Sequence, residues 1–343
     1  RRSSDLAPWR TYVNYNDPRL IEKYYSQMKE WFKYVDKYTV DGLLKRWPDT
    51  KYRDWYLGDW LAPMGVDAGN QASVDLVSNC FISECLSTMY KTAITLGKRE
   101  EAEEFAIRRE KLNKLIHQTF YRADEGIYST GSQLDMCYPM LVGVVPDSLY
   151  NKVKENVVAM TEEKYKGHIA VGLVGVPILT EWAVRNKQVD FFYQMMKKRD
   201  YPGYLYMIDH GATATWEYWS GERSRVHNCY NGIGTWFYQA VGGIRLDEAN
   251  SGYRHFYVDP QTPNGVTWAK VTKESPYGTI AVNWKLKDDN QLNLQLTVPA
   301  GTTATVCIPN NAVSCKKNKK KVSVKEQTVD VEAGHYDFLF NLK

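Results

Sequence analysis

The chain has 343 residues, of which 43% are hydrophobic and 24% are charged, a composition typical of a globular protein with length for about two domains. The net charge is only +4 and the basic residues are spread along the chain, which argues against a nucleic-acid partner. No apolar run reaches the roughly 18 residues of a membrane-spanning helix, so we expect no membrane partner.

The N-terminus carries neither an initiator Met nor an apolar signal stretch. We therefore expect a processed or truncated product, whose compartment cannot be read from this end. A soluble protein is expected, periplasmic or secreted rather than cytoplasmic.

Helical periodicity dominates from residue 9 to about 243. A helix over 18–38 begins at a capping Asp-Pro pair. Helices over 71–96 and 100–117 flank Gly97, a residue suited to a helix C-cap, and are expected to pair antiparallel. Shorter helices are predicted over 8–15, 133–143, 147–160, 173–185, 188–199 and 228–241. This is a mainly α domain whose helices form most, but not all, of an (α/α)6 toroid of paired helices.

After Gly243 the apolar period changes from 3.6 to 2, which indicates strands. Strands are predicted over 279–285, 292–298, 304–308, 322–331 and 336–342. The expected organisation is a catalytic toroid over 1–245 and an antiparallel β-sandwich over 246–343. The lysine run 316–321 is interpreted as a solvated hairpin tip without a function of its own.

The aromatic content, 13% with 25 Tyr and 11 Trp, suits a carbohydrate cleft and also a large aromatic core. The six cysteines lack metal-ligand spacing and are interpreted as mostly free and buried, with a Cys307–Cys315 disulfide as the lesser alternative. The six histidines are scattered. We therefore predict neither a metal site nor a cofactor.

The segment 210–219 is the main candidate for chemistry, because it places Glu217 between Trp216 and Trp219 in a stretch that regular structure does not fit. Sugars stack their C–H faces on aromatic rings, which makes Trp216 and Trp219 candidate substrate-binding residues. A carboxylate among such rings is poorly solvated, which tends to raise its pKa toward the range of a working acid or base. The alternative is a structural Glu217 paired with an arginine such as Arg223 or Arg225, among core aromatics.

Two further segments carry candidate substrate-binding residues. In the turn around Gly58, Asp59 is a candidate to bind sugar hydroxyls, and Trp60 is a candidate to stack on a sugar ring. The alternative is that Asp59 stabilises the loop and Trp60 belongs to the core. His227 lies at the expected start of a helix. It either contacts a ligand there or has a structural role. Gly232 and Gly234 in that helix indicate close packing behind the site.

Together these segments resemble the α-L-rhamnosidases of glycoside hydrolase family 78. The most specific part is Gly-Ala-Thr-x-x-Trp-Glu-x-Trp over residues 211–219, followed by His227-Asn228. Further matches lie at residues 8–12, 15–17, 58–60, 167–168, 172–175, 201–204 and 234–238, so that the resemblance covers nearly the whole chain.

The resemblance implies a six-hairpin toroid followed by a β-sandwich, and the inverting hydrolysis of terminal α-L-rhamnosides. Glu217 matches the family's general base, while Trp60 and His227 match residues that line the rhamnose site. The family's general acid belongs to an Arg-Asp-Glu-type motif upstream of the stretch that matches Trp9, and this sequence contains no such motif.

Two explanations for the missing acid are a fragment of a longer enzyme, favoured by the deficit of helices, and a noncatalytic remnant that binds sugar. A fragment would be inactive alone and would need the N-terminal part of the same enzyme as its partner. Another helical-toroid glycosidase or a phosphorylase is the alternative enzyme. The expected ligand is a rhamnose-containing glycoside, oligosaccharide or polysaccharide from a bacterial setting.

Overall fold

The computed structural model describes residues 6–47, 56–63, 70–287 and 290–343. The chain divides into two compact units, one formed mainly by residues 24–233 and the other by residues 7–23 and 234–343. Each unit is described below by itself. Residues 288–289, between the strands predicted over 279–285 and 292–298, lie outside the described residues.

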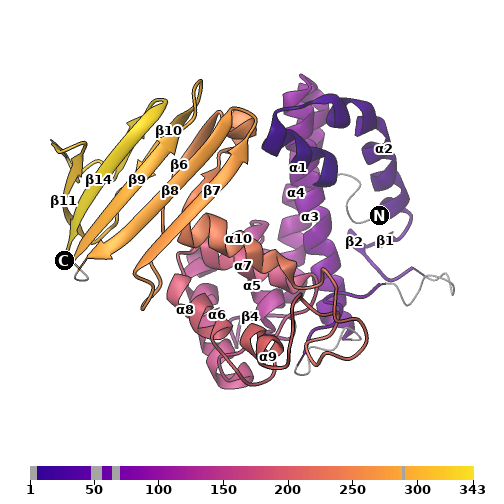
Figure 1. Cartoon of the computed structure of the whole chain (residues 1–343). Helices are drawn as coiled ribbons and strands as arrows, with labels where there is room; N and C mark the ends of the chain where they lie inside the picture. Colours follow the sequence, from indigo (N-terminus) through magenta and orange to yellow (C-terminus); the bar gives the residue numbers. More distant parts are fainter. Residues whose placement is uncertain (1–5, 48–55, 64–69, 288–289) are drawn as a thin grey trace. The chain divides into compact units, whose positions relative to one another are not determined.

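The first unit is helical, and its helices are coloured from indigo to magenta in Figure 1. Its helices are α2 (Arg19–Asp36, whose first turn belongs to the second unit), α3 (Gln71–Thr95), α4 (Arg99–Phe120), α5 (Gln133–Leu141), α6 (Asp147–Tyr165), α7 (Gly175–Arg185), α8 (Val189–Met196) and α9 (Tyr204–Asp209). Two short hairpins, β1–β2 (Thr39–Val40, Leu43–Leu44) and β3–β4 (Tyr121–Arg122, Ile127–Tyr128), join them. All the predicted helices of this unit are present, and the short α9 was not predicted.

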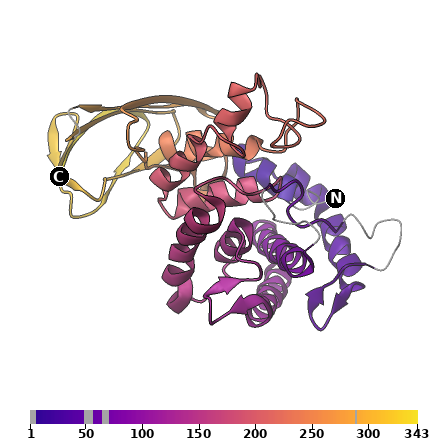
Figure 2. The same cartoon turned by 90° about the horizontal axis from the view of Figure 1, so that it is seen from below.

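The helices pack as inner and outer partners. The pairs α3–α4, α5–α6 and α7–α8 each pack together, and the first members also contact one another in the order α3, α5, α7. Helix α3 is buried on most sides, whereas α4 buries little more than a stripe that includes Leu112 and Ile116. Figure 2 looks nearly along the axes of α3 and α4, shown in purple. This is the paired-helix arrangement that the periodicity predicts.

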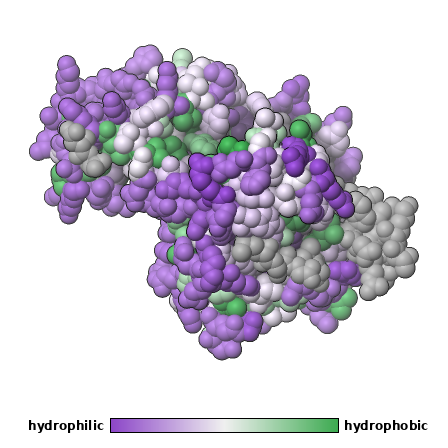
Figure 3. All heavy atoms as spheres, turned by 60° about the horizontal axis from the view of Figure 1, so that its bottom comes forward, coloured by the Kyte–Doolittle hydropathy of each residue, from purple (hydrophilic) through white to green (hydrophobic). Residues whose placement is uncertain are grey.

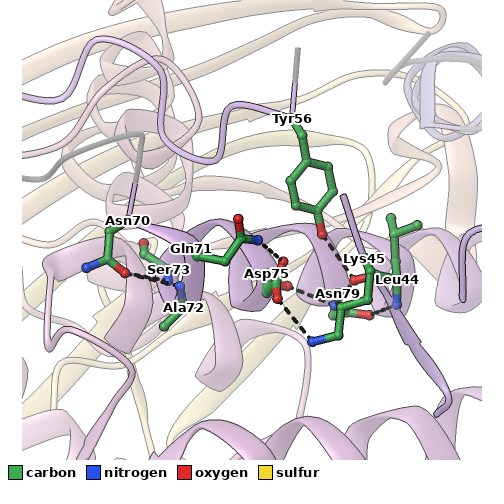
Figure 4. A network of polar contacts seen from close by, with 9 residues as sticks. All are labelled: Leu44, Lys45, Tyr56, Asn70, Gln71, Ala72, Ser73, Asp75 and Asn79. Atoms are coloured by element: carbon green, nitrogen blue, oxygen red, sulfur yellow. Dashed lines mark hydrogen bonds and ion pairs between the residues drawn. The ribbon is translucent and has the colours of Figure 1, made fainter. Parts of the chain in front are cut away.

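The start of α3 is held by a network of polar contacts (Figure 4). Asn70 caps the helix by accepting the backbone N–H groups of its first turn. Within the helix, Asn79 donates to the carbonyl of Leu44 at 3.0 Å and accepts its N–H at 2.8 Å. The hydroxyl of Tyr56 donates to the same carbonyl at 3.1 Å. These contacts fasten the chain that leads into residues 56–63 onto an inner helix.

The second unit contains α1 (Leu6–Tyr15) and two sheets. The four-stranded sheet has the order β13-β10-β6-β5, with β5 (Ile244–Leu246), β6 (His255–Val258), β10 (Thr303–Cys307) and β13 (Thr328–Val331). The six-stranded sheet has the order β12-β11-β14-β9-β8-β7, with β7 (Trp268–Ser275), β8 (Gly278–Lys287), β9 (Gln291–Val298), β11 (Ala312–Lys317), β12 (Lys320–Val322) and β14 (Gly334–Leu342). The predicted sandwich is antiparallel except for one parallel pair, β10 with β6.

Two predicted elements differ from the structure, and four strands were not predicted. The strand expected over 322–331 is split between the end of β12 and β13. Strands β5, β6, β7 and β11 were not predicted. The helix expected over 228–241 consists instead of a 3₁₀ turn (Asn231–Ile233), a short α turn, α10 (Gly234–Trp236), and a π turn (Phe237–Val241). Gly232 explains part of this, because a Cβ there would lie 3.0 Å from Pro177 of α7; Gly234 faces open space.

None of the six cysteines forms a disulfide, so the alternative of a Cys307–Cys315 disulfide is wrong; all but the half-buried Cys307 are buried. The lysine run lies at a hairpin as predicted, but only residues 318–319 form its turn, because the other lysines belong to the paired strands β11 and β12.

The surface seen in Figure 3 is mostly hydrophilic, with smaller apolar areas in green. Among the described helices, none combines the length and the apolar character needed to cross a bilayer.

Candidate functional site

The first component of the site is the described loop 56–63, which carries Asp59 and Trp60. Asp59 is only 2% exposed, and its two carboxylate oxygens accept the N–H groups of Gly172 at 2.7 Å and Gly175 at 2.8 Å. Both acceptor atoms are thus occupied by backbone donors at the start of α7. This geometry corresponds to the loop-stabilising alternative: Asp59 positions its neighbour Trp60 and does not face a ligand.

Trp60 is half-buried, with its ring on the side of His227. The two ring centroids lie 6.5 Å apart at an interplanar angle of 66°. The Trp60 carbonyl accepts the N–H of Leu173 at 2.8 Å, and Gly172 lies so close that a Cβ there would be 2.1 Å from the same carbonyl oxygen. Trp60 is therefore not a core residue. Its backbone is fixed and its ring remains accessible.

The second component is the Trp-Glu loop, defined as residues 210–227, which follows α9. As predicted, it contains no regular helix or strand. Its two halves are joined by backbone hydrogen bonds, Glu217 N–H to Ser224 O at 2.9 Å and His227 N–H to Thr215 O at 2.8 Å. The loop is therefore closed on itself, which brings the backbone of His227 against Thr215, two residues before Glu217.

Trp216 and Trp219 face the interior, with 1% and 2% of their surfaces exposed. The indole N–H of Trp219 donates to the carbonyl of Val171 at 2.9 Å. The Trp216 ring lies beneath the guanidinium of Arg225, 5.1 Å from the ring centroid. We predicted both rings as sugar-contacting residues; in this structure they are closed off from solvent and support the loop from inside.

Glu217 is half-buried, and its carboxylate accepts a hydrogen bond from a residue of the same loop. Its Oε2 accepts the N–H of Ser224 at a long 3.4 Å. The two arginines of the structural alternative lie over aromatic rings: Arg223 over Tyr218 at 5.4 Å, and Arg225 over Trp216. Within the described residues neither forms an ion pair with Glu217. The carboxylate thus keeps most of its capacity to accept hydrogen bonds.

His227 is half-buried, and its ring neighbours that of Trp60. Its Nδ1 accepts the backbone N–H of Cys229 at 3.1 Å, so that in the neutral ring the proton resides on Nε2. The pKa of the Cys229 thiol is raised to about 11, first by burial and then by the charge of Glu217. The thiol therefore stays protonated, while His227 offers an N–H donor on the side of Trp60.

Tyr230 connects the two components and was not predicted as a site residue. Its buried hydroxyl is 3.1 Å from the carbonyl of Leu61 and 3.2 Å from that of Glu217, and it donates to this pair. The Tyr230 ring stacks on Trp219 at 4.1 Å, and its own carbonyl accepts the hydroxyl of Tyr204 at 2.8 Å. Burial raises the pKa of Tyr230 far above its usual value, so the donor is retained. Its position next to His227-Asn228 in the chain is the only hint in the sequence.

Residues 171–175 lie behind both components. Their backbone groups donate to Asp59 and to the Trp60 carbonyl, and accept from Trp219. One segment thus contacts both the loop 56–63 and the Trp-Glu loop. Of the predicted site residues, Trp60, Glu217 and His227 keep part of their surface exposed, and the rings of Trp60 and His227 are neighbours, while Asp59, Trp216 and Trp219 are buried.

The raised pKa of Asp59 predicts that the stability of the protein depends on pH. Burial raises the pKa of Asp59 from 3.8 to about 7, against the opposing hydrogen bonds from Gly172 and Gly175. Because the folded-state pKa lies above the unfolded one, the stability that this group contributes is fully present below pH 4 and is lost as the pH rises through 7. At about 1.4 kcal/mol per pKa unit, the change is a few kcal/mol.

Asp59→Asn removes this titration. We expect the difference in unfolding free energy, wild type minus Asp59→Asn, to decrease between pH 4 and 7 and to level off above, as measured by urea unfolding. Asp124→Asn, in the exposed turn between β3 and β4, serves as the control substitution. A difference that stays constant from pH 4 to 8 would show that the buried carboxyl does not take up a proton on folding.

The described residues contain no cluster of three or more His, Cys, Asp or Glu side chains able to hold a metal ion. The chemistry available from the residues just described is that of a carboxylate, an imidazole N–H and an aromatic face.

Comparisons with known families give two matches. Residues 3–241 match the model of the bacterial alpha-L-rhamnosidase 6 hairpin glycosidase domain, and residues 243–323 that of the bacterial alpha-L-rhamnosidase C-terminal domain.

Among curated proteins, an alpha-L-rhamnosidase of Alteromonas sp. (strain LOR) is 25% identical over 98% of this chain, and one of Formosa agariphila is 27% identical over 97%. The chain spans only 37% of the length of each.

Two solved structures show the same fold. The Streptomyces avermitilis alpha-L-rhamnosidase complexed with L-rhamnose superposes with a TM-score of 0.86 at 22% identity, covering 98% of this chain and 32% of that one. The alpha-L-rhamnosidase from Dictyoglumus thermophilum gives 0.87 at 21% identity, covering 97% and 38%. The predicted fold class, a six-hairpin toroid followed by a β domain, is confirmed.

Proposed function

We propose, since the chain belongs to the family of bacterial α-L-rhamnosidases with a six-hairpin glycosidase domain, that it contributes the general base and part of the sugar site to an enzyme that hydrolyses terminal α-L-rhamnosides. The observation that carries the proposal is the state of Glu217. Its backbone is held by Ser224 and Tyr230, while its carboxylate is half-buried and not paired with either neighbouring arginine.

The proposed reaction inverts the anomeric centre. Glu217 takes a proton from a water molecule, whose oxygen forms a bond to the anomeric carbon as the bond to the leaving oxygen breaks. A second carboxyl group gives its proton to that oxygen. In inverting glycosidases the two carboxyl groups stand roughly 6.5–9.5 Å apart, which leaves room for the water. The products are the free alcohol and rhamnose of inverted anomeric configuration.

We assign the general acid to a part of the enzyme outside these 343 residues. The assignment is supported by the absence of the Arg-Asp-Glu-type motif from the sequence and by the 37% of the relatives' length that the chain spans. The same reasoning makes the missing part the partner on which activity depends.

In this proposal Trp60 and His227 contact the sugar directly. The accessible Trp60 ring offers a face for the C–H groups of rhamnose, and the Nε2–H of His227 offers a donor for a hydroxyl. Asp59, Trp216 and Trp219 act as positioning residues, because their polar atoms are occupied or their rings are covered.

The test compares two proteins, the 343-residue chain alone and the complete gene product, on an aryl α-L-rhamnoside. We expect turnover by the complete protein only, with the β-anomer of rhamnose as the first product in NMR spectra recorded during the reaction. Turnover by the chain alone would contradict the external general acid, and the α-anomer as first product would contradict inversion. Binding of rhamnose without hydrolysis by the complete protein would instead identify a noncatalytic carbohydrate-binding protein.

A further inference from the structure

The six-stranded sheet of the second unit has one polar face that the proposed reaction does not use. Strands β7, β8, β9, β14 and β11 run side by side in Figure 1. Side chains alternate between the two faces of these strands. Residues such as Trp284, Leu294 and Phe338 are buried on one face, whereas their neighbours Asn283, Gln295 and others point to the opposite one. This second surface is termed the polar face below.

Cross-strand hydrogen bonds order the side chains of the polar face. Asn283 donates to Gln295 at 3.0 Å, and Gln295 donates to Asp337 at 3.3 Å, which forms a row across three strands. A second row runs from Gln291 to Asn341 at 2.9 Å, and from there to Ser314 at 2.7 Å. The polar groups are therefore held in position before any ligand arrives, which lowers the entropic cost of binding.

An exposed tryptophan adjoins these rows. Trp268 of β7 is 63% exposed and stands directly across from Lys285 of β8, which in turn faces Asn293 of β9. All three belong to the polar face, because side chains alternate along a strand and the adjacent residues Ala269 and Trp284 are buried on the other face. A solvated sheet face has no need of an exposed indole, whereas a sugar ring stacks on one readily.

The polar face is also hollowed and basic. A hollow of about 660 Å³ is lined by the row of Asn283, Gln295 and Asp337 and by lysines of three segments. The lysines on or beside the central rows are Lys270, Lys285, Lys316 and Lys319. Asp337 is the acidic residue within the hollow, so the charge around it is positive.

We propose that the polar face binds an acidic oligosaccharide, one that carries uronate groups. Trp268 stacks on a sugar ring, the ordered amides of Asn283 and Gln295 pair with hydroxyls, and Lys285 and Lys316 pair with carboxylates. Planar amides, which both donate and accept hydrogen bonds, suit the hydroxyl groups of a sugar. A polyanion without hydroxyl-rich rings would need only cationic side chains for its recognition. This surface lies in a different unit from Glu217 and goes beyond the proposed hydrolysis.

The test uses calorimetric titration of the 343-residue chain with an oligomer of galacturonic acid, its methyl ester, and a single-stranded DNA of equal charge. We expect the acid oligomer to bind, the neutral ester to bind at least about tenfold more weakly, and the DNA to bind more weakly than the acid oligomer. Trp268→Ala should weaken binding of the acid oligomer about tenfold or more, because the aromatic face on which the sugar ring stacks is lost.

The double variant Lys285→Gln/Lys316→Gln should weaken binding similarly and reduce its dependence on salt. Tyr257→Ala, which removes an exposed aromatic of the other sheet, and Lys37→Gln, on the first unit, are matched controls expected to bind as wild type. Equal binding of acid and ester, binding unaffected in both the Trp268 and lysine variants, or DNA binding as tight as that of the oligosaccharide would each overturn the proposal. Because no turnover is measured, the outcome is independent of the role of Glu217.

Discussion

Glu217→Gln in the complete enzyme is expected to lower kcat for an aryl α-L-rhamnoside by at least about a hundredfold, the loss that follows removal of a general base. The amide has nearly the shape of the carboxylate, and its oxygen can still accept the N–H of Ser224. It cannot, however, take a proton from water. We therefore expect KM to change little, because the substitution removes an interaction made in the transition state.

Glu222→Gln is the matched control, since Glu222 is an exposed carboxylate of the same Trp-Glu loop. It should retain nearly all of the wild-type kcat. A further variant, Glu217→Ala, should regain turnover with added azide, because this anion attacks the anomeric carbon without giving up a proton and forms the β-rhamnosyl azide. Near-normal kcat in Glu217→Gln, or an equal loss in Glu222→Gln, would rule out Glu217 as the base.

Gly172→Ala is expected to displace the loop that carries Trp60. A Cβ at this position would lie 2.1 Å from the Trp60 carbonyl oxygen and 2.6 Å from the nitrogen of Ala62, both backbone atoms that cannot move aside alone. Overpacking of this kind costs roughly 1–3 kcal/mol of stability, and occasionally more. Displacing the Trp60 ring from His227 should also lower kcat/KM of the complete enzyme by more than about tenfold.

Gly234→Ala provides the control for the glycine substitution itself. No atom lies within 4 Å of the position that its Cβ would take, and Gly234 begins the short helix α10. Stability should stay the same or rise slightly, since alanine favours a helix over glycine by about 1 kcal/mol. If Gly172→Ala unfolds at the wild-type temperature and keeps its KM, the backbone contact between residues 171–175 and the Trp60 loop is not what positions the site.

Local patterns in the sequence were sufficient for the long helices. The boundaries of α3 and α4 follow from a capping residue, Asn70, and from Gly97, which adopts a φ of +74° between them. The spacing of apolar residues in each helix reflects the apolar side that the helix buries, whichever element it packs against. The sequence did not reveal the strand β7, because the apolar side of this strand consists of short residues such as Ala269. The regular helix expected after Asn228 does not form in part because Gly232 lies close to Pro177, and no local pattern reveals that contact.

For the site, the sequence by itself determined the irregular loop around Glu217 and its resemblance to one glycosidase family, because both depend on residues that are neighbours in the chain. Only the tertiary structure decided which side chains face outward. Asp59 is turned toward Gly172, more than a hundred residues away, and Trp219 toward Val171. A hydrogen bond between a side chain and a backbone group far away in the sequence is a property of packing. Packing thus distinguishes the accessible Trp60 and His227 from the buried aromatic residues that support them.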